Sequence, residues 1–267
     1  MKFFTEPIRV CGWEVPLRCY LPDAAPKAFY QKNRPAILVF PGGGYVYTYP
    51  GEAEPIALQY LAAGFCAFVL DYSVAPVRFP QALLEALTAI RTVREHAAEY
   101  GIDPQRISAC GFSAGGHLAG CTGTLWNHPC LDGMLEGARE QYRPDAMVLS
   151  YPVLTYESHR DSYRNLLGEN DTAPMREFLS LNLRVGAHTP PAFLWHTAED
   201  DGVSAECSLL FAAAMRRSHI PFEIHVYENG GHGSCLGNYV SGFGQAPDQP
   251  NASAAWVEAS IRFLLRH

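Results

Sequence analysis

One serine of this sequence lies in a five-residue pattern that can activate its hydroxyl group. The segment GFSAG places Ser113 between Gly111 and Gly115, after an apolar run that predicts a strand and before a stretch that predicts a helix. A serine on such a tight turn points outward, because the flanking glycines have no side chains to collide with the strand and the helix. The turn also leaves the amide of Ala114 at the start of the helix, free to donate to an oxyanion. We therefore predict that Ser113 is a nucleophile.

A serine hydroxyl is a weak nucleophile near neutral pH, so it needs a base, and the base needs a carboxylate to orient it. The segment YENGGHGSC offers His232 as that base, because it follows a predicted strand and lies among glycines that let a loop bring an imidazole to the edge of a sheet. Other histidines lie in strands, helices or polar stretches without such a loop. His117, in the helix after the serine, is one of these, and we predict that it is structural.

Three acidic residues compete for the third position, in the segment TAEDDGVSAEC that follows a predicted strand. They are Glu199, Asp200 and Asp201. We favour Asp200, because it stands three residues before Val203, where we expect the next helix to begin, and this spacing suits a carboxylate that reaches back to the histidine loop. Asp201 is the second choice. The alternative for each is a helix cap, since the helix dipole stabilises a carboxylate near a helix N-terminus.

A run of three glycines in VFPGGGYVY can supply further backbone donors. Gly42, Gly43 and Gly44 directly follow the predicted strand at 36–40, and a loop of glycines can direct its amides at a ligand where side chains would block the approach. The alternative is a plain flexible turn. A dinucleotide site is not indicated, because no G-x-G-x-x-G pattern opens a helix here. Tyr45, the next residue, is predicted to shape the substrate pocket.

Short apolar runs alternate with helical patterns along the chain and predict the elements that hold these residues. The strands are expected at 36–40, 66–70, 106–110, 146–150, 192–196 and 223–227, and the helices at 53–63, 81–100, 114–126, 205–218 and 252–265. An N-terminal hairpin is expected to turn at Cys11, Gly12 and Trp13. This order predicts an α/β fold with a mainly parallel sheet, an antiparallel edge and helices on both faces.

One polar segment interrupts the alternation of strands and helices. Residues 154–191 follow the predicted strand at 146–150 and contain two short helical patterns. Loops at the carboxyl edge of a parallel sheet border the ligand site in such folds. We interpret the segment as a lid-like insertion or a wall of the substrate site. A surface decoration is the alternative.

Length and composition set limits on the class of protein. The sequence has 267 residues, of which 48% are hydrophobic and 18% charged, and we expect a single domain over 1–267. A net charge of −7 without a basic cluster argues against a nucleic-acid partner and favours small neutral or cationic ligands. No apolar run has the length of a membrane span or a signal peptide, so we expect a cytoplasmic protein without a membrane partner. The oligomeric state stays open, with a homo-oligomer among the options.

Eight cysteines are scattered along the chain without a C-x-x-C pattern. In a cytoplasmic protein such residues serve as small buried hydrophobes more often than as disulfides. His117 and Cys121 can share a helix face, but no paired ligand spacing accompanies them. We therefore predict neither a metal nor an organic cofactor.

Together these segments resemble the bacterial α/β-hydrolase esterases related to acetyl-xylan esterases and carboxylesterases. The resemblance runs from PAILVFPGGGY through LDYSVAP, GFSAGGHLAG and PPAFLWHTAEDDGVSAEC to FEIHVYENGGHG. It implies the α/β-hydrolase fold with its chain order of serine, aspartate and histidine. The residues that it implies are Ser113 as nucleophile, Asp200 and His232 as its partners, and Gly43, Gly44 and Ala114 as the amide donors of an oxyanion hole.

The resemblance also implies the kind of substrate. Where lipase-like relatives carry His-Gly-Gly-Gly, this chain has Pro41 before its glycines, and its sheet pattern begins without their large N-terminal cap. Both departures favour small acyl groups such as acetyl, on a sugar or another small alcohol, over long-chain lipids. The expected reaction is hydrolysis of a small-molecule ester through an acyl-enzyme, with no cofactor.

Two other functions fit part of the pattern. Serine peptidases of the prolyl-oligopeptidase type share this order of catalytic residues, but they usually add a large propeller domain that the sequence lacks. A binding protein that kept the fold without the chemistry is the second alternative. The sequence argues against it, because all three catalytic residue types and both glycine segments are present.

Overall fold

Strands and helices alternate along the chain in a computed structural model that describes residues 1–23, 33–238, 241 and 251–267. The strands are β1 (Lys2–Val10), β2 (Trp13–Leu21), β3 (Arg34–Phe40), β4 (Cys66–Leu70), β5 (Ile102–Phe112), β6 (Ala146–Ser150), β7 (Ala192–Thr197) and β8 (Phe222–Tyr227). The helices are α1 (Glu54–Ala62), α2 (Gln81–Glu95), α3 (Ala97–Tyr100), α4 (Ala114–Leu125), α5 (Arg160–Leu167), α6 (Ala173–Phe178), α7 (Glu206–Arg217) and α8 (Trp256–Leu264). Short 3₁₀ turns, such as η1 (Pro50–Glu52) and η4 (Tyr156–Ser158), lie between them.

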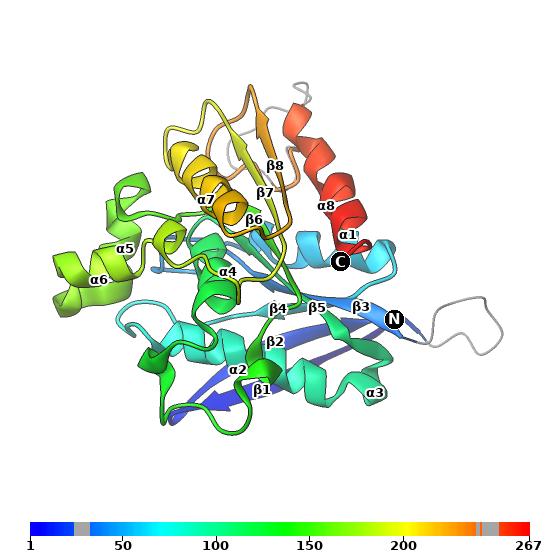
Figure 1. Ribbon diagram of the computed structural model, residues 1–267. Coiled ribbons are helices and arrows are strands. Elements are labelled where there is room, and N and C mark those ends of the chain that lie inside the picture. Colours follow the sequence, from blue (N-terminus) through cyan, green and yellow to red (C-terminus); the bar gives the residue numbers. More distant parts are fainter. Residues whose placement is uncertain (24–32, 239–240, 242–250) are drawn as a thin grey trace.

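The strands form one sheet in the order β1-β2-β4-β3-β5-β6-β7-β8 (Figure 1). β1 pairs antiparallel with β2, and β2 pairs antiparallel with β4. The remaining pairs are parallel. The predicted α/β fold, with a mainly parallel sheet and an antiparallel N-terminal hairpin, is therefore confirmed. The single domain predicted over 1–267 stays a prediction.

The predicted strands and helices are present, with corrections to three of them. β5 begins at Ile102, four residues before the predicted start. The helix predicted over 81–100 is two helices, because α2 ends at Glu95 and His96 leaves the helical conformation with φ −91° and ψ 10°. The helix predicted over 252–265 begins with a 3₁₀ turn before α8.

The order of the strands places two loops of interest beside each other. From β3 the chain first crosses to β4 on one side and later continues with β5 on the other side. Phe40 at the end of β3 pairs with Gly111 near the end of β5, so both strands end at the same level. The loops after these two strands run in opposite directions from this topological switch point. In α/β sheets a crevice for a ligand forms at such a point.

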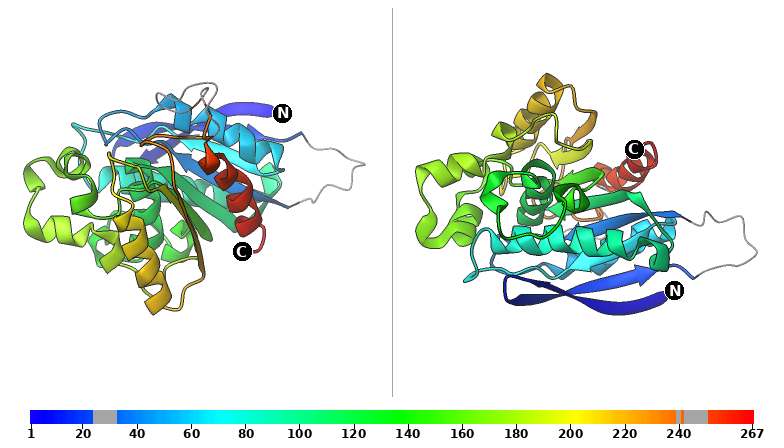
Figure 2. Two further views of the ribbon diagram at one scale, coloured as in Figure 1. Left: turned by 90° about the horizontal axis from the view of Figure 1, so that it is seen from above. Right: turned by 60° about the horizontal axis from the view of Figure 1, so that its bottom comes forward.

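Helices cover both faces of the sheet (Figures 1 and 2). α1 and α8 pack on one face, while α2, α4 and α7 pack on the other. β3 shows why, since Leu38 and Phe40 belong to one hydrophobic cluster and Ile37 and Val39 to the other. A strand buried on both faces needs apolar side chains at every position, which is the pattern in its sequence.

α8 supports the loop that carries His232. Trp256 stacks on Trp195 with ring centroids 5.3 Å apart, and it meets Phe112 edge-on at 5.7 Å. Its indole Nε1 donates a hydrogen bond of 2.7 Å to the carbonyl of Cys235. Because Cys235 follows His232 by three residues, the helix fixes the loop as well as covering the sheet.

All eight cysteines are free thiols, and six of them are buried, as their scattered spacing predicts. Within the described ranges, no helix is long and apolar enough to cross a membrane. In the same part of the chain, no three histidine, cysteine or acidic side chains form a group that could hold a metal ion.

We predict that Gly115→Ala destabilises the fold. The new Cβ would come within 2.0 Å of the carbonyl oxygen of Phe40, where α4 crosses the end of β3. Overpacking of this kind costs about 1–3 kcal/mol, so the free energy of unfolding measured in urea should fall by at least about 1 kcal/mol. Gly231→Ala is the control, because a Cβ there meets no atom within 4 Å. Equal stability of the two variants would contradict this packing.

Candidate active site

The backbone of Ser113 is strained, and its neighbours hold it from several sides. Its φ of 52° and ψ of −118° are values that residues other than glycine rarely adopt. The amide of Ser113 donates to Ser150 O at 3.0 Å, and its carbonyl accepts from Val153 N at 3.1 Å and His117 N at 3.0 Å. These bonds connect the turn to the end of β6 and to α4. The surrounding structure therefore maintains a conformation that presents the hydroxyl.

Three side chains that we predicted to act together lie in one hydrogen-bonded chain. His232 Nε2 lies 2.8 Å from Ser113 Oγ, and His232 Nδ1 lies 2.8 Å from Asp200 Oδ2. With a hydrogen on Nδ1, the imidazole donates to the carboxylate and accepts from the serine hydroxyl. The side chain of Asp200 is 1% exposed and that of His232 is 28% exposed. The chain of bonds thus runs from a buried charge to the edge of the sheet.

The carboxylate of Asp200 is held by more than the catalytic imidazole. Its Oδ1 accepts from Gly202 N at 3.0 Å and Val203 N at 2.8 Å. His196 Nε2 lies 3.3 Å from its Oδ2. Burial raises the pKa of this carboxyl, but the contacts with His196 and His232 and the Val203 amide outweigh it and hold the pKa below its ordinary value. Asp200 therefore stays ionised and can accept from Nδ1–H.

The geometry distinguishes the three acidic candidates. Among the described acidic residues, Asp200 is the one within hydrogen-bond distance of His232. Asp201 is exposed. Glu199 is also exposed, and its carboxylate accepts from Gly230 N at 3.1 Å, which ties the loop after β7 to the histidine loop.

One reason for preferring Asp200 was wrong. The helix expected from Val203 begins at Glu206. The amide of Val203 instead closes a turn on Asp200 Oδ1. The carboxylate thus accepts amides of its own loop and orients the imidazole at the same time.

Hydrogen bonds hold the carbonyls of the glycine loop after β3. They run from Tyr72 Oη to Pro41 O (2.6 Å), Tyr49 N to Gly42 O (2.9 Å), Val46 N to Gly43 O (3.0 Å), Asn165 Nδ2 to Gly44 O (2.9 Å) and Ala75 N to Tyr45 O (2.8 Å). In a trans peptide the N–H points away from the preceding C=O. The fixed carbonyls therefore direct the amides of Gly43 and Gly44 to the opposite side, where no described protein atom accepts from them.

The third predicted donor is the amide of Ala114. It is the first residue of α4, where the opening amides of a helix have no partner within the helix. The helix dipole adds a preference for negative charge at this end. Ala114 follows Ser113 directly, so this amide and the glycine loop come from the two sides of the switch point.

A cavity of about 490 Å³ is lined by these groups. Its described lining residues are Gly43, Gly44, Val46, Tyr47, Tyr49, Glu52, Ser113, His159, His232 and Gly233. Val46 and Tyr47 are 53% and 52% exposed, so they form its open rim. The apolar rim and the polar floor suit an uncharged organic ligand.

The structure places Tyr45 behind the loop and not in the wall of the cavity. Its hydroxyl donates to His117 Nδ1 at 2.8 Å, and His117 Nε2 donates to Leu179 O at 3.0 Å. Burial lowers the pKa of His117 to about 4, so the ring is neutral and structural, as predicted. Tyr45 anchors the glycine loop to α4, and its neighbours Val46 and Tyr47 line the cavity instead.

His159 brings the 154–191 insertion to the cavity. Its Nδ1 accepts from Ser162 N at 3.2 Å, at the start of α5. A neutral ring that accepts on Nδ1 carries its hydrogen on Nε2. Burial and the charge of nearby His232 lower the pKa of His159, which favours this neutral form. The insertion therefore offers the ligand a hydrogen-bond donor.

The insertion is attached to the rest of the site and forms a wall of it. In both views of Figure 2 it is the yellow-green segment with α5 and α6 at one end of the sheet. Leu181 N donates to Leu154 O at 2.8 Å and closes the segment, and Asn165 connects it to Gly44. The interpretation as a substrate wall fits these contacts. Movement as a lid stays a prediction.

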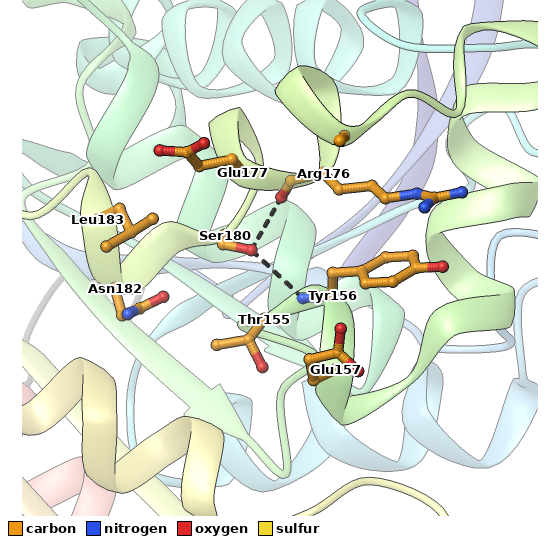
Figure 3. A pocket seen from close by; sticks show the side chains of 9 residues that line it. Thr155, Tyr156, Glu157, Arg176, Glu177, Ser180, Asn182 and Leu183 are labelled. Atoms are coloured by element: carbon orange, nitrogen blue, oxygen red, sulfur yellow. Dashed lines mark hydrogen bonds between the residues drawn. The ribbon is translucent and has the colours of Figure 1, made fainter.

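A second cavity, of about 430 Å³, lies within the insertion and shares no described lining residue with the first (Figure 3). Ser180 Oγ donates to Arg176 O at 2.8 Å and accepts from Tyr156 N at 3.3 Å. The guanidinium of Arg176 lies 4.5 Å from the Tyr156 ring centroid and donates to Asp171 at 2.7 Å. These bonds connect the two ends of the insertion around the second cavity.

Glu52 and His159 are among the residues of the main cavity that sequence reasoning missed. Glu52 lies at the start of a helical pattern, where an acidic residue is typical of a helix N-terminus. His159 lies in a polar stretch without glycines. No short motif contains either residue, and only the folded arrangement brings them to Ser113.

The chain is similar to known proteins in sequence and in fold. A family model described as BD-FAE matches residues 20–215. The chain is 39% identical over 213 residues to endo-1,4-beta-xylanase B of Butyrivibrio fibrisolvens, which covers 77% of this chain and 33% of that protein. The crystal structure of an acetyl ester-xyloside bifunctional hydrolase from Caldicellulosiruptor lactoaceticus matches with a TM-score of 0.81 and 38% identity, over 95% of this chain and 88% of that one.

A propionate-bound esterase, Est2 from Thermogutta terrifontis, matches with a TM-score of 0.78 and 29% identity, over 99% of this chain and 94% of that one. The crystal structure of MGS-M1, an alpha/beta hydrolase enzyme from a Medee basin deep-sea metagenome library, matches with a TM-score of 0.77 and 34% identity, over 99% of this chain and 97% of that one, and confirms the α/β-hydrolase fold. The chain spans a third to a half of the length of the first curated relatives, from 33% to 49%.

We predict that Asp200→Asn slows the reaction of Ser113 with a fluorophosphonate by about 10⁴-fold, because an amide holds the imidazole in the wrong tautomer. Asp201→Asn is the control and should label at the rate of the unchanged protein. The labelling rate is measured by mass spectrometry at neutral pH. A larger loss for Asp201→Asn would show that the other carboxylate orients the base.

Proposed function

The chain belongs to the BD-FAE family of carboxylic ester hydrolases, and from this membership we propose that the protein hydrolyses short acyl esters, above all acetyl esters of sugars and other small alcohols. One observation carries the proposal. The hydrogen-bonded chain from Asp200 through His232 to Ser113 ends in a cavity that unpaired backbone amides also line. Such an arrangement suits attack on an ester carbonyl and stabilisation of the oxyanion that results.

In the first half of the reaction, Ser113 Oγ attacks the carbonyl carbon while His232 Nε2 takes the hydroxyl proton. The carbonyl oxygen becomes an oxyanion and accepts from the amides of Gly43, Gly44 and Ala114. The C–O bond to the alcohol then breaks, and the imidazolium gives its proton to the departing alkoxide. The products of this half are the free alcohol and an acyl group on the serine.

The second half repeats the same steps with water. His232 Nε2 takes a proton from a water molecule, which attacks the acyl carbon, and the tetrahedral intermediate again faces the amides. The bond to Ser113 Oγ breaks, the serine regains its proton, and the carboxylic acid leaves. The carboxylate of Asp200 stabilises the imidazolium in both halves, since its depressed pKa keeps it charged.

The size and chemistry of the cavity support a small acyl group on a polar alcohol. A volume of about 490 Å³ accommodates an acetylated sugar unit. His159 offers a hydrogen-bond donor to an alcohol hydroxyl from the insertion. Two of the similar proteins carry names that refer to xylose-containing substrates, and a third is an esterase with bound propionate. We propose the same class of short esters here.

Cleavage of a xyloside at this cavity has less support. Glycosidases generally use two carboxyl groups, about 5–10 Å apart, on either side of the scissile bond. Among the described residues that line the cavity, Glu52 is the one acidic residue. Both of its oxygens already accept hydrogen bonds. We therefore propose ester hydrolysis alone for this site.

We predict that Ser113→Ala abolishes hydrolysis of 4-nitrophenyl acetate while the circular dichroism spectrum is unchanged. Loss of a triad serine lowers kcat by about 10⁶-fold in a serine hydrolase. Ser218→Ala, at the far end of α7, is the matched control and should retain full turnover. Turnover by Ser113→Ala close to that of the control would refute the assignment of the nucleophile.

The acyl specificity gives a second prediction. A series of 4-nitrophenyl esters from acetate through butyrate to octanoate is expected to show the highest kcat/KM for the shortest acyl groups, because the cavity of about 490 Å³ must also hold the alcohol part of the ester. Each poorly accommodated methylene should cost about 1 kcal/mol or more in kcat/KM. Octanoate hydrolysed as efficiently as acetate would contradict the proposed substrate class.

A further inference from the structure

Glu52 is an ionisable side chain at a buried position, where a charge costs free energy. Its side chain lines the main cavity but is only 3% exposed, and among the described residues no lysine or arginine pairs with it. Burial of a carboxylate without a cationic partner is costly. The two halves of the reaction described above do not use it. A buried ionisable group at the edge of an active site points to a role in the site.

The two oxygens of Glu52 connect two loops that carry different parts of the site. Oε2 accepts from Gly42 N at 2.7 Å, and Oε1 accepts from Tyr151 Oη at 2.6 Å. Tyr151 Oη in turn accepts from Cys235 N at 3.1 Å, three residues after His232. The Tyr151 ring also lies edge-on to the His232 ring, with centroids 5.2 Å apart. The glycine loop and the histidine loop are thus bound to one carboxylate.

The packing around Gly42 leaves no room for a side chain. A Cβ at Gly42 would come within 2.7 Å of Glu52 Oε2, 2.7 Å of Phe112 O and 3.0 Å of Ser113 Cβ. The glycine therefore fills the space between the carboxylate and the nucleophile. The carbonyls of Gly42 and Gly43 accept from Tyr49 N and Val46 N of the same loop, so a shift of the Gly42 amide would be passed on to the next two peptides.

We propose that Glu52 is a positioning residue that fixes the Gly42 peptide, and with it the direction of the Gly43 and Gly44 amides, while Tyr151 keeps the histidine loop in register with them. Glu52 acts through Gly42, and none of its described hydrogen bonds is to Ser113 or His232. The inference rests on the proposed function, since the direction of these amides matters for turnover only if an oxyanion forms.

The donors around Glu52 explain why a carboxylate occupies the position. The Gly42 N–H and the Tyr151 O–H each meet a separate oxygen, and the Cys235 thiol lies 3.9 Å from Oε1. Burial raises the pKa of Glu52, while the bonds from Tyr151 and Gly42 and the charge of His232 oppose that rise. Glutamine can keep the bond from Gly42 N on its one acceptor oxygen, but its amide nitrogen can only donate to Tyr151 Oη, so the second bond is reversed. Alanine keeps neither. The three side chains therefore form a graded series for an experiment.

The test compares Glu52→Ala and Glu52→Gln with a matched control on 4-nitrophenyl acetate, with rates normalised to folded protein by circular dichroism. Glu85 is the control site, because it is a fully buried carboxylate that also accepts from a backbone amide, Ser73 N at 2.7 Å, but does not line the cavity. Glu85→Ala should lower stability and leave kcat of the folded protein unchanged.

Glu52→Ala is expected to lower kcat by about 10²-fold, as a small misplacement of oxyanion donors does, and to change KM by less than about 3-fold. Glu52→Gln should recover at least about 10-fold of that loss. A kcat for Glu52→Ala within about 2-fold of the unchanged protein would overturn the inference. So would a glutamine variant no faster than the alanine variant. If the unchanged protein hydrolyses no ester, the proposed function is wrong. That outcome differs from one in which the unchanged protein is active and the Glu52 variants behave like the control.

A double-mutant cycle keeps the test decisive if Glu52→Ala does not fold. Tyr151→Phe removes the hydroxyl between Glu52 and Cys235 and fills the same space. If one chain of bonds positions both loops, Glu52→Gln combined with Tyr151→Phe should lose about as much kcat as the worse single variant. Losses that multiply would show that the two residues act independently and would overturn the inference.

Discussion

The strained backbone of Ser113 is the constraint on which the rest of the site depends. A serine with φ of 52° persists only because its amide and carbonyl are bound to the ends of β6 and α4. Gly115 lets α4 approach Phe40 O so closely that a methyl group would not fit. The sheet order then brings the glycine loop after β3 beside this turn, at the switch point between β3 and β5.

Charge is arranged around the turn so that little must move during the reaction. On one side, the ionised carboxylate of Asp200 is fixed by its own loop and by His196, and it orients His232. On the other side lie the amides of the glycine loop and the start of α4. Such preorganised dipoles and charges stabilise developing charge without reorganisation. Glu52 lies between the two sides and, through Tyr151, sets their distance.

The sequence predicts the elements and the reacting residues because short motifs and hydrophobic periodicity are local signals. The strands, the hairpin and the segments around Ser113 and His232 all have such signals. The individual side chains that face the cavity from its wall have none. Whether Tyr45 or its neighbours Val46 and Tyr47 face a ligand depends on the positive φ of 60° at Tyr45 and on its bond to His117, which no pattern near it indicates. Glu52 and His159 also reach the cavity through long-range contacts, so no local pattern predicts their place in it.

The account is tested most directly by trapping the covalent intermediate. The protein is mixed with 4-nitrophenyl acetate, quenched in acid within the first turnover, digested and analysed by mass spectrometry. We expect one acetyl group, on the peptide that contains Ser113, at a level that falls as the substrate is consumed. An acetyl group on another residue, or rapid turnover with no acetylated peptide at any time, would contradict the account.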